Sequence, residues 1–499
     1  MTLVAQLPAE MHASTADKRG EFVVRLHREF KPRSDQSREA VENAIMTLAD
    51  QALRHASLIS DDAVETIESI IASIDEKLSE QINEILHHQD FQALESAWRG
   101  LHHLTFNTET DETLKIRVLS ISKKEMSRTL RKFKGIAWDQ SPLFKKIYEE
   151  EYGQVGGEPY GCLVADYFFD HSPHDIELLT GIAQIAAASH SPFISAASPH
   201  LLQMDSWCEL ANPRDISKIF LTPEHGAWRA FRESEDSRYV ALTLPRMLGR
   251  LPYGAKTNPV DQFAFEEDTE GGDSSKYLWT NAAYAMGVNI TRSFKLYGWL
   301  SRIRGFESGG LVEDLPVHTF PSDDGGVDLK CPTETAISDR RESELSKNGL
   351  LPLLHRKNTQ LGVFLGGQTV NKAIRYEDPE AAANAELSAR LPYIFATCRF
   401  AHHLKCMVRD KIGAFKERSE VEEWLNHWIQ GYVHPSPELG SEESKALQPL
   451  SSAEVKVEEI EDNPGYYTAI FYLRPHYQLE GLTISLRLVS RMSSIRSNH

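Results

Sequence analysis

The order of secondary-structure signals between residues 110 and 250 restricts the fold of this chain more than any other feature. A continuous apolar run at 160–169 has the length of a buried strand, and the segment 172–189 that follows reads as a helix. Further strand-like runs occupy 191–196 and 237–244. Strand, helix and strand in succession favour parallel pairing, because parallel strands need a crossover connection. The sequence therefore predicts a mixed α/β core.

The N-terminal region has a helical pattern instead. Beyond Asp61, apolar side chains recur at spacings of three and four residues, which places them on one face of a helix: Val64, Ile67, Ile71, Ile74 and Leu78. This stripe is close to a coiled-coil seam. It predicts either a helix packed on its own core or an arm that pairs with a helix of another chain. After this arm, the run 114–121 alternates apolar residues with period two and predicts a strand.

The C-terminal region is rich in β signals. Residues 432–448 contain Pro, Gly and Ser and predict a hinge, and two strand-like runs joined by the turn 462–465 predict a hairpin. A last half-buried strand has four apolar residues on one face: Leu482, Ile484, Leu486 and Leu488. Such a strand either closes its own sheet or pairs with a neighbouring molecule. We therefore expect a helical arm (1–105), an α/β core (106–435), and a hinge with C-terminal strands (436–499).

Composition narrows the functional classes. The formal net charge of −18 disfavours a nucleic-acid partner, which needs clustered Lys and Arg. Five scattered cysteines are too few for a disulfide framework, and an odd number fits a reducing compartment. We find neither a signal-peptide pattern nor an apolar run long enough to span a membrane. These features predict a cytoplasmic protein without membrane insertion.

The stretch CRFAHHLKC at 398–406 carries the densest group of metal-ligand residue types. On a helix, Cys398, His402 and Cys406 share one face, but the outer two lie about 12 Å apart along the axis. All three therefore cannot bind one zinc ion, although two of them could. An apolar stripe includes Cys398 and favours core packing. A metal-dependent cytosolic enzyme centred on Cys398 and His402 remains the alternative.

Motifs for other chemistry are incomplete. Gly254-Ala255-Lys256-Thr257 lacks the glycine that a phosphate-binding loop needs directly before its lysine. We find no catalytic motif, and the sequence predicts no catalytic residue, cofactor or metal ligand. The charged segment 338–349 predicts a surface helix that ends at Gly349.

Long tracts of the chain resemble one family, the large subunit of the type VI secretion contractile sheath, called TssC or VipB. The resemblance covers most of the chain from about residue 60 onward. The tracts that carry it are DFQALESAWRGLHHL (90–104), KIRVLSISKKEM (115–126), 138–167, MDSWCELANPRDISKIF (204–220), RLPYGAKTNPVDQFAFEEDT (250–269), 289–310, 315–349, 391–418 and 463–492.

The resemblance implies a structural, non-enzymatic subunit with a core like that of phage tail sheaths. Members of this family pair with a small subunit, TssB, and assemble with further TssC copies into a tubule around the Hcp inner tube, on a baseplate. Their contraction propels that tube, and the ClpV ATPase recycles the sheath mainly through TssB. The helical arm would then pair with a TssB helix. Leu482, Ile484, Leu486 and Leu488 would lie on a strand that augments a sheet of a neighbouring subunit. An adaptor that binds without polymerising is a further alternative.

Overall fold

The computed structural model describes residues 35–37, 39, 40, 43, 63–212, 215–261, 263–269, 274–321, 326–411, 417–436, 440–459 and 467–476. The chain forms two compact units. The smaller comprises 1–92 with 252–277, and the larger comprises 93–251 with 278–499. None of the helices in the described residues is both long and apolar enough to cross a membrane.

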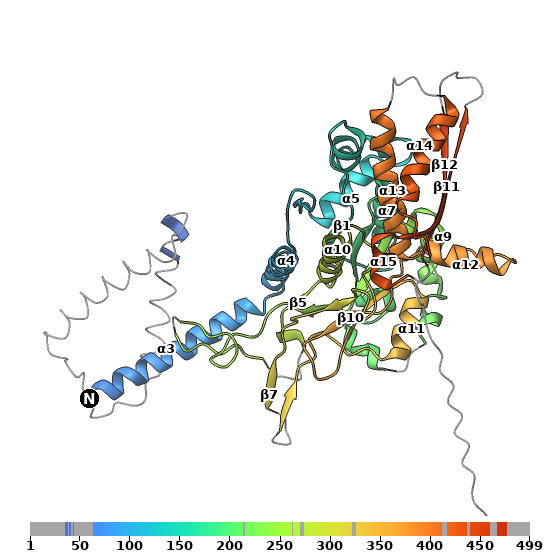
Figure 1. Ribbon diagram of the computed structural model, residues 1–499. Coiled ribbons are helices and arrows are strands. Elements are labelled where there is room, and N and C mark those ends of the chain that lie inside the picture. The colour runs from blue at the N-terminus through green and yellow to red at the C-terminus, as the bar shows by residue number, and fades with distance from the viewer. Residues whose placement is uncertain are drawn as a thin grey trace, which may run out of the picture. The chain divides into compact units, whose positions relative to one another are not determined.

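A six-stranded mixed sheet forms the centre of the larger unit (Figure 1). Its strands, in spatial order, are β1 (Leu163–Phe169), β2 (Phe193–Ala197), β3 (Val240–Leu244), β9 (Leu351–His355), β10 (Gly362–Phe364) and β6 (Leu311–Val312). The first four pair in parallel and the last three are antiparallel. The predicted mixed α/β core with parallel pairs is therefore confirmed.

Two helices cover the two faces of this sheet. Helix α7 (Pro173–Ser189) begins where the Ser172 hydroxyl accepts a hydrogen bond from the Asp175 N–H, with proline in the first turn. It shares one apolar core with Leu242, whereas α10 (Ala283–Tyr297) shares a second core with Ala241. Neighbouring residues of β3 thus enter opposite cores, as the two-residue period of a strand requires.

The remaining elements of the two units are helices, single helical turns and short sheets. The helices are α3 (Ala63–Leu86), α4 (Gln89–Phe106), α5 (Lys123–Lys132), α6 (Pro142–Phe144), α8 (Ile216–Ile219), α9 (Gly226–Glu233), α11 (Asp339–Lys347), α12 (Pro379–Ser388), α13 (Leu391–Asp410), α14 (Arg418–Gln430) and α15 (Glu442–Leu447). The single-turn and π-helical segments are η1 (Gly135–Gln140), η2 (Lys145–Gly153), η3 (Pro199–Leu202), η4 (Trp207–Ala211), η5 (Pro223–His225), η6 (Asp236–Tyr239) and η7 (Ser274–Lys276). Short two-stranded sheets pair β4 (Met247–Leu248) with β5 (Trp279–Thr280) and β7 (Thr319–Pro321) with β8 (Val327–Leu329).

The strand predicted at 114–121 is wrong. These residues belong to no strand, although their alternating pattern is real. Side-chain ion pairs hold the segment in place, because Arg117 binds Glu151 and Glu158. Val118 and Leu119 remain exposed. A two-residue alternation of apolar side chains is compatible with a strand, but a strand also needs a neighbour that supplies main-chain hydrogen bonds.

A C-terminal module follows the sheet. Helix α13 carries Leu391 and Phe395 into the α10-side core and then Phe400 and Leu404 into a third core shared with α14 and β11 (Leu450–Glu459). Strand β11 pairs antiparallel with β12 (Tyr467–Pro475), so the predicted hairpin is confirmed. The predicted hinge at 432–448 contains α15. Its movement stays a prediction.

The smaller unit joins α3 to the loop 252–277. The Asn83 side-chain amide donates to the Glu266 carbonyl at 3.4 Å and accepts from the Asp268 N–H at 2.9 Å. The same loop is closed by the Tyr253 N–H, which donates to the Glu267 carboxylate at 2.8 Å. The end of the helix is thus tied to a loop more than 160 residues later in the sequence.

Candidate assembly surfaces

The described side chains of the α3 seam are not fully buried. The helix includes all five predicted seam residues, so the predicted helix is confirmed, while its role as an arm that pairs with another chain stays a prediction. Ile71 is exposed, and Ile74 and Leu78 are only partly buried. The side chains of Val64 and Ile67 lie outside the described residues. Between residues 71 and 86 no side chain is fully buried, and the role of the seam in binding a partner helix stays a prediction.

Helix α4 carries an apolar face that our sequence reasoning missed. Leu94, Trp98 and Phe106 are exposed on it, and the Trp98 residue is 67% exposed. The opposite face is anchored, because the Ser96 hydroxyl donates to the Trp279 carbonyl at 3.0 Å and Glu95 pairs with the buried Arg250 at 2.7 Å. Trp98 follows Leu94 by four residues and Phe106 follows Trp98 by eight, and this spacing in the sequence could have revealed the face.

Gly100 makes the close approach of α4 possible. A Cβ atom at this position would overlap the ring of Tyr284, which is itself buried. Helix α4 is therefore fixed by close packing on one side and displays Trp98 on the other. A large exposed aromatic residue on a fixed helix is typical of a protein–protein contact.

One edge of the central sheet is formed by β1, to which no further strand pairs within the described residues. Strand β1 is the outermost strand, and within it only Phe169 is fully buried. The segment 114–121 approaches its end, where the Tyr167 hydroxyl donates to the Ile121 carbonyl at 2.6 Å. An edge strand next to an extended apolar segment is a surface that can pair with another chain.

The two strands of the C-terminal hairpin differ in the contacts that their main chains make. On β11, the Val455 N–H donates to the Asn426 side chain at 2.9 Å, and the same amide donates to the Val455 carbonyl at 2.8 Å. Glu422 accepts from the Val457 N–H at 2.9 Å, and Gln430 donates to the Ala453 carbonyl at 3.0 Å. Three polar side chains spaced by four residues on α14 thus satisfy the outer edge of β11.

Strand β12 forms the other side of this two-stranded sheet. On it Tyr472 is exposed, whereas Val455 of β11 is fully buried. Side chains of α14 thus satisfy the outer edge of β11, and within the described residues no third strand pairs with β12. The four predicted strand-exchange residues, Leu482, Ile484, Leu486 and Leu488, lie outside the described residues.

The residues of the CRFAHHLKC stretch separate in the structure. Cys398 and His402 are buried in α13, and His403 is exposed. The His402 Nε2–H donates to the Ser189 carbonyl at 2.9 Å, and burial lowers the pKa of His402 to about 3. Burial also raises the pKa of the Cys398 thiol. Cys398 and His402 thus have contacts typical of core packing, and within the described residues no group of three His, Cys, Asp or Glu side chains could hold a metal ion.

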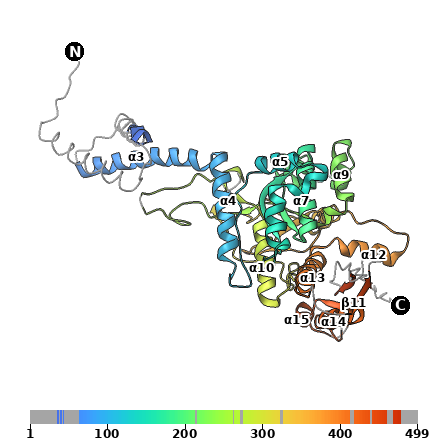
Figure 2. The same ribbon diagram turned by 90° about the horizontal axis from the view of Figure 1, so that it is seen from above.

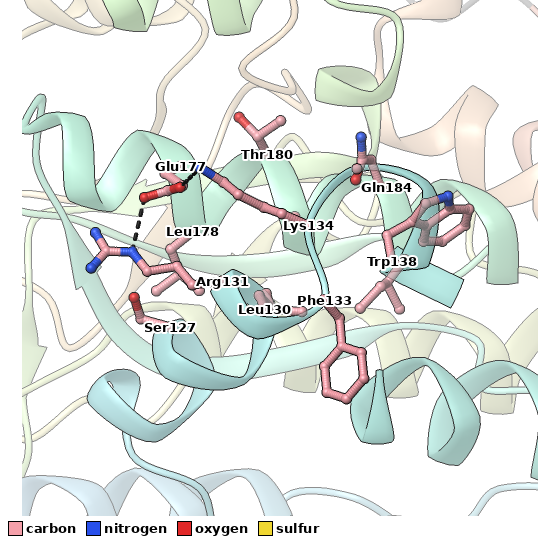
Figure 3. Close-up of a pocket in the computed structure, with 13 residues that line it drawn as sticks. Ser127, Leu130, Arg131, Phe133, Lys134, Trp138, Glu177, Leu178, Thr180 and Gln184 are labelled. Atoms are coloured by element: carbon pink, nitrogen blue, oxygen red, sulfur yellow. Dashed lines mark hydrogen bonds and ion pairs between the residues drawn. The ribbon is translucent and has the colours of Figure 1, made fainter. Parts of the chain in front are cut away.

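A cavity of about 380 Å³ lies between α5 and α7 (Figure 3). Its carboxylate, Glu177, pairs with Arg131 at 2.9 Å and also with Lys134. These cations lower the pKa of Glu177, the hydrogen bond from Lys134 being the main cause. A carboxylate held ionised by two cations is a structural ion pair rather than a general acid or base.

Sequence comparison agrees with a surface built for assembly. Residues 68–371 match the EvpB/VC_A0108 tail sheath N-terminal domain, and residues 380–492 match the EvpB/VC_A0108 tail sheath gpW/gp25-like domain. The chain thus belongs to the contractile tail-sheath proteins, a structural and non-enzymatic class.

A curated relative is more specific. The chain is 66% identical over 483 residues to the type VI secretion system sheath protein TssC1 of Pseudomonas aeruginosa PAO1, covering 97% of both chains. The chain therefore belongs to the TssC/VipB family of type VI secretion sheath subunits.

Solved structures of lower similarity include a chain of the anti-feeding prophage baseplate, with 12% identity, a TM-score of 0.34 and coverage of 76% of this chain and 84% of that chain. The contracted helical sheath of the same prophage gives 12% identity, a TM-score of 0.28 and coverage of 62% and 66%. At these TM-scores neither structure supports a conclusion about this chain.

Proposed function

We propose that this sheath subunit co-assembles with the small subunit TssB and with further copies of itself into a tubule around the Hcp inner tube. Contraction of the tubule would propel the inner tube. The observation that carries the proposal is the two-stranded sheet in which side chains of α14 satisfy β11 and, within the described residues, no third strand pairs with β12. A single open strand edge on an otherwise satisfied sheet is a site for strand addition.

The donated strand is the predicted strand that contains Leu482, Ile484, Leu486 and Leu488. Its apolar face would pack on the partner's module, and its main chain would pair with β12. Main-chain hydrogen bonds between molecules keep neighbours linked while side-chain contacts rearrange. This property suits an assembly that passes between an extended and a contracted state.

The small subunit TssB is assigned to two other surfaces. The seam of α3 would receive a TssB helix, and the face around Trp98 on α4 offers a second apolar contact. The exposed charged residues of α11 would form different contacts in the two states. The family resemblance also implies contact with the baseplate and recycling by ClpV through TssB. All five cysteines are free thiols, which supports a cytoplasmic location.

Co-expression with the small subunit tests this proposal. We expect hollow tubules in negative-stain electron micrographs of the wild-type pair. Deletion of residues 480–499 should abolish the tubules and leave a soluble complex of the two subunits. The matched control replaces Thr483, Ser485 and Arg487, on the opposite face of the predicted strand, by alanine and should still assemble. A wild-type pair that stays soluble at every concentration would instead support the adaptor alternative.

A further inference from the structure

Helix α5 carries an exposed basic ridge on a strongly acidic chain. Lys124, Arg128 and Lys132 follow one another at four-residue spacing, and all three are exposed. Met126 and Ser127 of the same helix are buried, so the ridge faces away from the core. The whole chain has a formal net charge of −18. A continuous row of cations is therefore a local exception.

The neighbouring cations form close ion pairs, whereas none of the ridge side chains does within the described residues. Lys123 pairs with Asp175 at 2.6 Å, and Arg131 and Lys134 both pair with Glu177 (Figure 3). Among the described residues the ridge side chains form no ion pair; the nearest carboxylate on the helix, Glu125, is bonded to Ser122 in a capping box. Like charges spaced by four residues repel each other, so this arrangement weakens the isolated helix.

The start of α14 offers a complementary acidic ridge. Glu417, Glu420 and Glu423 are exposed at three-residue spacing, and within the described part of the chain none of them forms an ion pair. Glu422, by contrast, is engaged by the Val457 N–H at 2.9 Å. The acidic ridge extends about 9 Å along its helix and the basic ridge about 12 Å, which allows three charges to face three.

The two ridges belong to one unit but lie apart in it. Figure 2 shows α5 and α14 on opposite sides of the larger unit, with α7 and α13 between them. Complementary surfaces on opposite sides of one molecule allow a head-to-tail contact, which repeats without closing when the rotation is not that of a ring.

We propose that Lys124, Arg128 and Lys132 of one copy contact Glu417, Glu420 and Glu423 of a second copy in the assembled tubule. The partner is a second copy because the same chain carries an unpaired acidic ridge of matching length. This inference rests on the proposed function for the polymer in which the contact forms. The contact is one of exposed charges, so it is screened by salt.

Charge exchange tests the contact in the co-expressed complex. Lys124→Glu with Arg128→Glu should lower the tubule fraction about tenfold at physiological salt, because attraction becomes repulsion. Glu420→Lys with Glu423→Lys should do the same, and the four substitutions together should restore tubules. Lys357→Glu with Arg375→Glu changes the net charge equally at other exposed positions and should assemble normally. Thermal unfolding of each soluble complex checks that the variants fold.

The outcomes separate this contact from the proposed function. If wild-type tubules form and the Lys124/Arg128 variant also forms them, the ridge contact is refuted and the sheath function stands. If that variant fails and the fourfold variant fails as well, the second copy is refuted as the partner. If the wild type never forms tubules, the sheath function itself fails.

Discussion

Asn426 offers the sharpest test of how the hairpin edge is sealed. Its side chain replaces a strand neighbour, because it both accepts from the Val455 N–H at 2.9 Å and donates to the Val455 carbonyl at 2.8 Å. Val455 is only 1% exposed, so water does not readily substitute for these contacts. Replacement of Asn426 by alanine removes both hydrogen bonds and introduces a residue that itself favours the helix.

The expected cost follows from these two contacts. An internal hydrogen bond contributes about 0.5–1.5 kcal/mol, so losing two of them costs about 1–3 kcal/mol. The closed form of the β11 edge is disfavoured by this amount, which corresponds to about 5- to 150-fold faster exchange of the Val455 amide. Gln430→Ala removes one contact, to the Ala453 carbonyl, from an exposed side chain and should give a smaller change.

Hydrogen–deuterium exchange measured by mass spectrometry on peptides of β11 gives the result directly. The Asn426→Ala variant should accelerate exchange in β11 and leave the peptides of α7 unchanged. Unchanged exchange at Val455 would refute the view that α14 seals this edge. Faster exchange throughout the chain would point to global destabilisation and would equally contradict a local role.

Three further predictions concern packing, partner binding and pH. Gly100→Val should destabilise the protein by about 1–3 kcal/mol, because the added side chain overlaps the buried Tyr284 ring; thermal unfolding measures this, and Gly226→Ala, whose added Cβ meets the Arg229 Nη2 at 4.0 Å in ordinary van der Waals contact, is the control. Leu94→Ser with Trp98→Ser should leave folding unchanged and lower co-purification of TssB about tenfold, since both residues are exposed; equal recovery of TssB would exclude the α4 face from the contact. The pKa of His402 is lowered to about 3 in the folded chain, so the unfolded chain binds the extra proton and stability falls as the pH drops from about 6.5 toward 3. His402→Gln should remove this part of the acid sensitivity, about 2 kcal/mol at pH 5, in denaturant unfolding followed across that range; an identical pH dependence in the two proteins would contradict the assignment.

Local sequence patterns predicted the elements whose partners lie close by in the chain. Helix α7 has its own cap and proline, and the hairpin of β11 and β12 needs only its turn and matching alternation. Residues 379–410 form two helices, α12 and α13, because Pro392 lies in the first turn of α13 and Arg390 before that turn has extended backbone.

Other features depend on distant contacts that no local pattern records. The run 114–121 has the alternation of a strand, but it becomes one only if another chain supplies the hydrogen bonds. The sealing of β11 uses Glu422, Asn426 and Gln430, which read in the sequence as ordinary polar positions of a surface helix. The exposed face of α4 was readable from its spacing, but only the buried contact of Gly100 with Tyr284 fixes which side is free.

Under the proposed strand addition, the sealed edge of β11 would give the assembly a direction. If both edges of the hairpin were open, two hairpins could pair with each other and compete with the donated strand. With β11 closed by α14, each module would accept a strand along β12 alone, and a donated C-terminal strand would link each copy to one defined neighbour. Copies that each have a formal net charge of −18 repel one another at separations up to about the Debye length. Main-chain pairing, which salt does not screen strongly, a local contact between opposite charges, and the apolar contacts proposed for α3 and α4 would together hold such acidic subunits in the assembly.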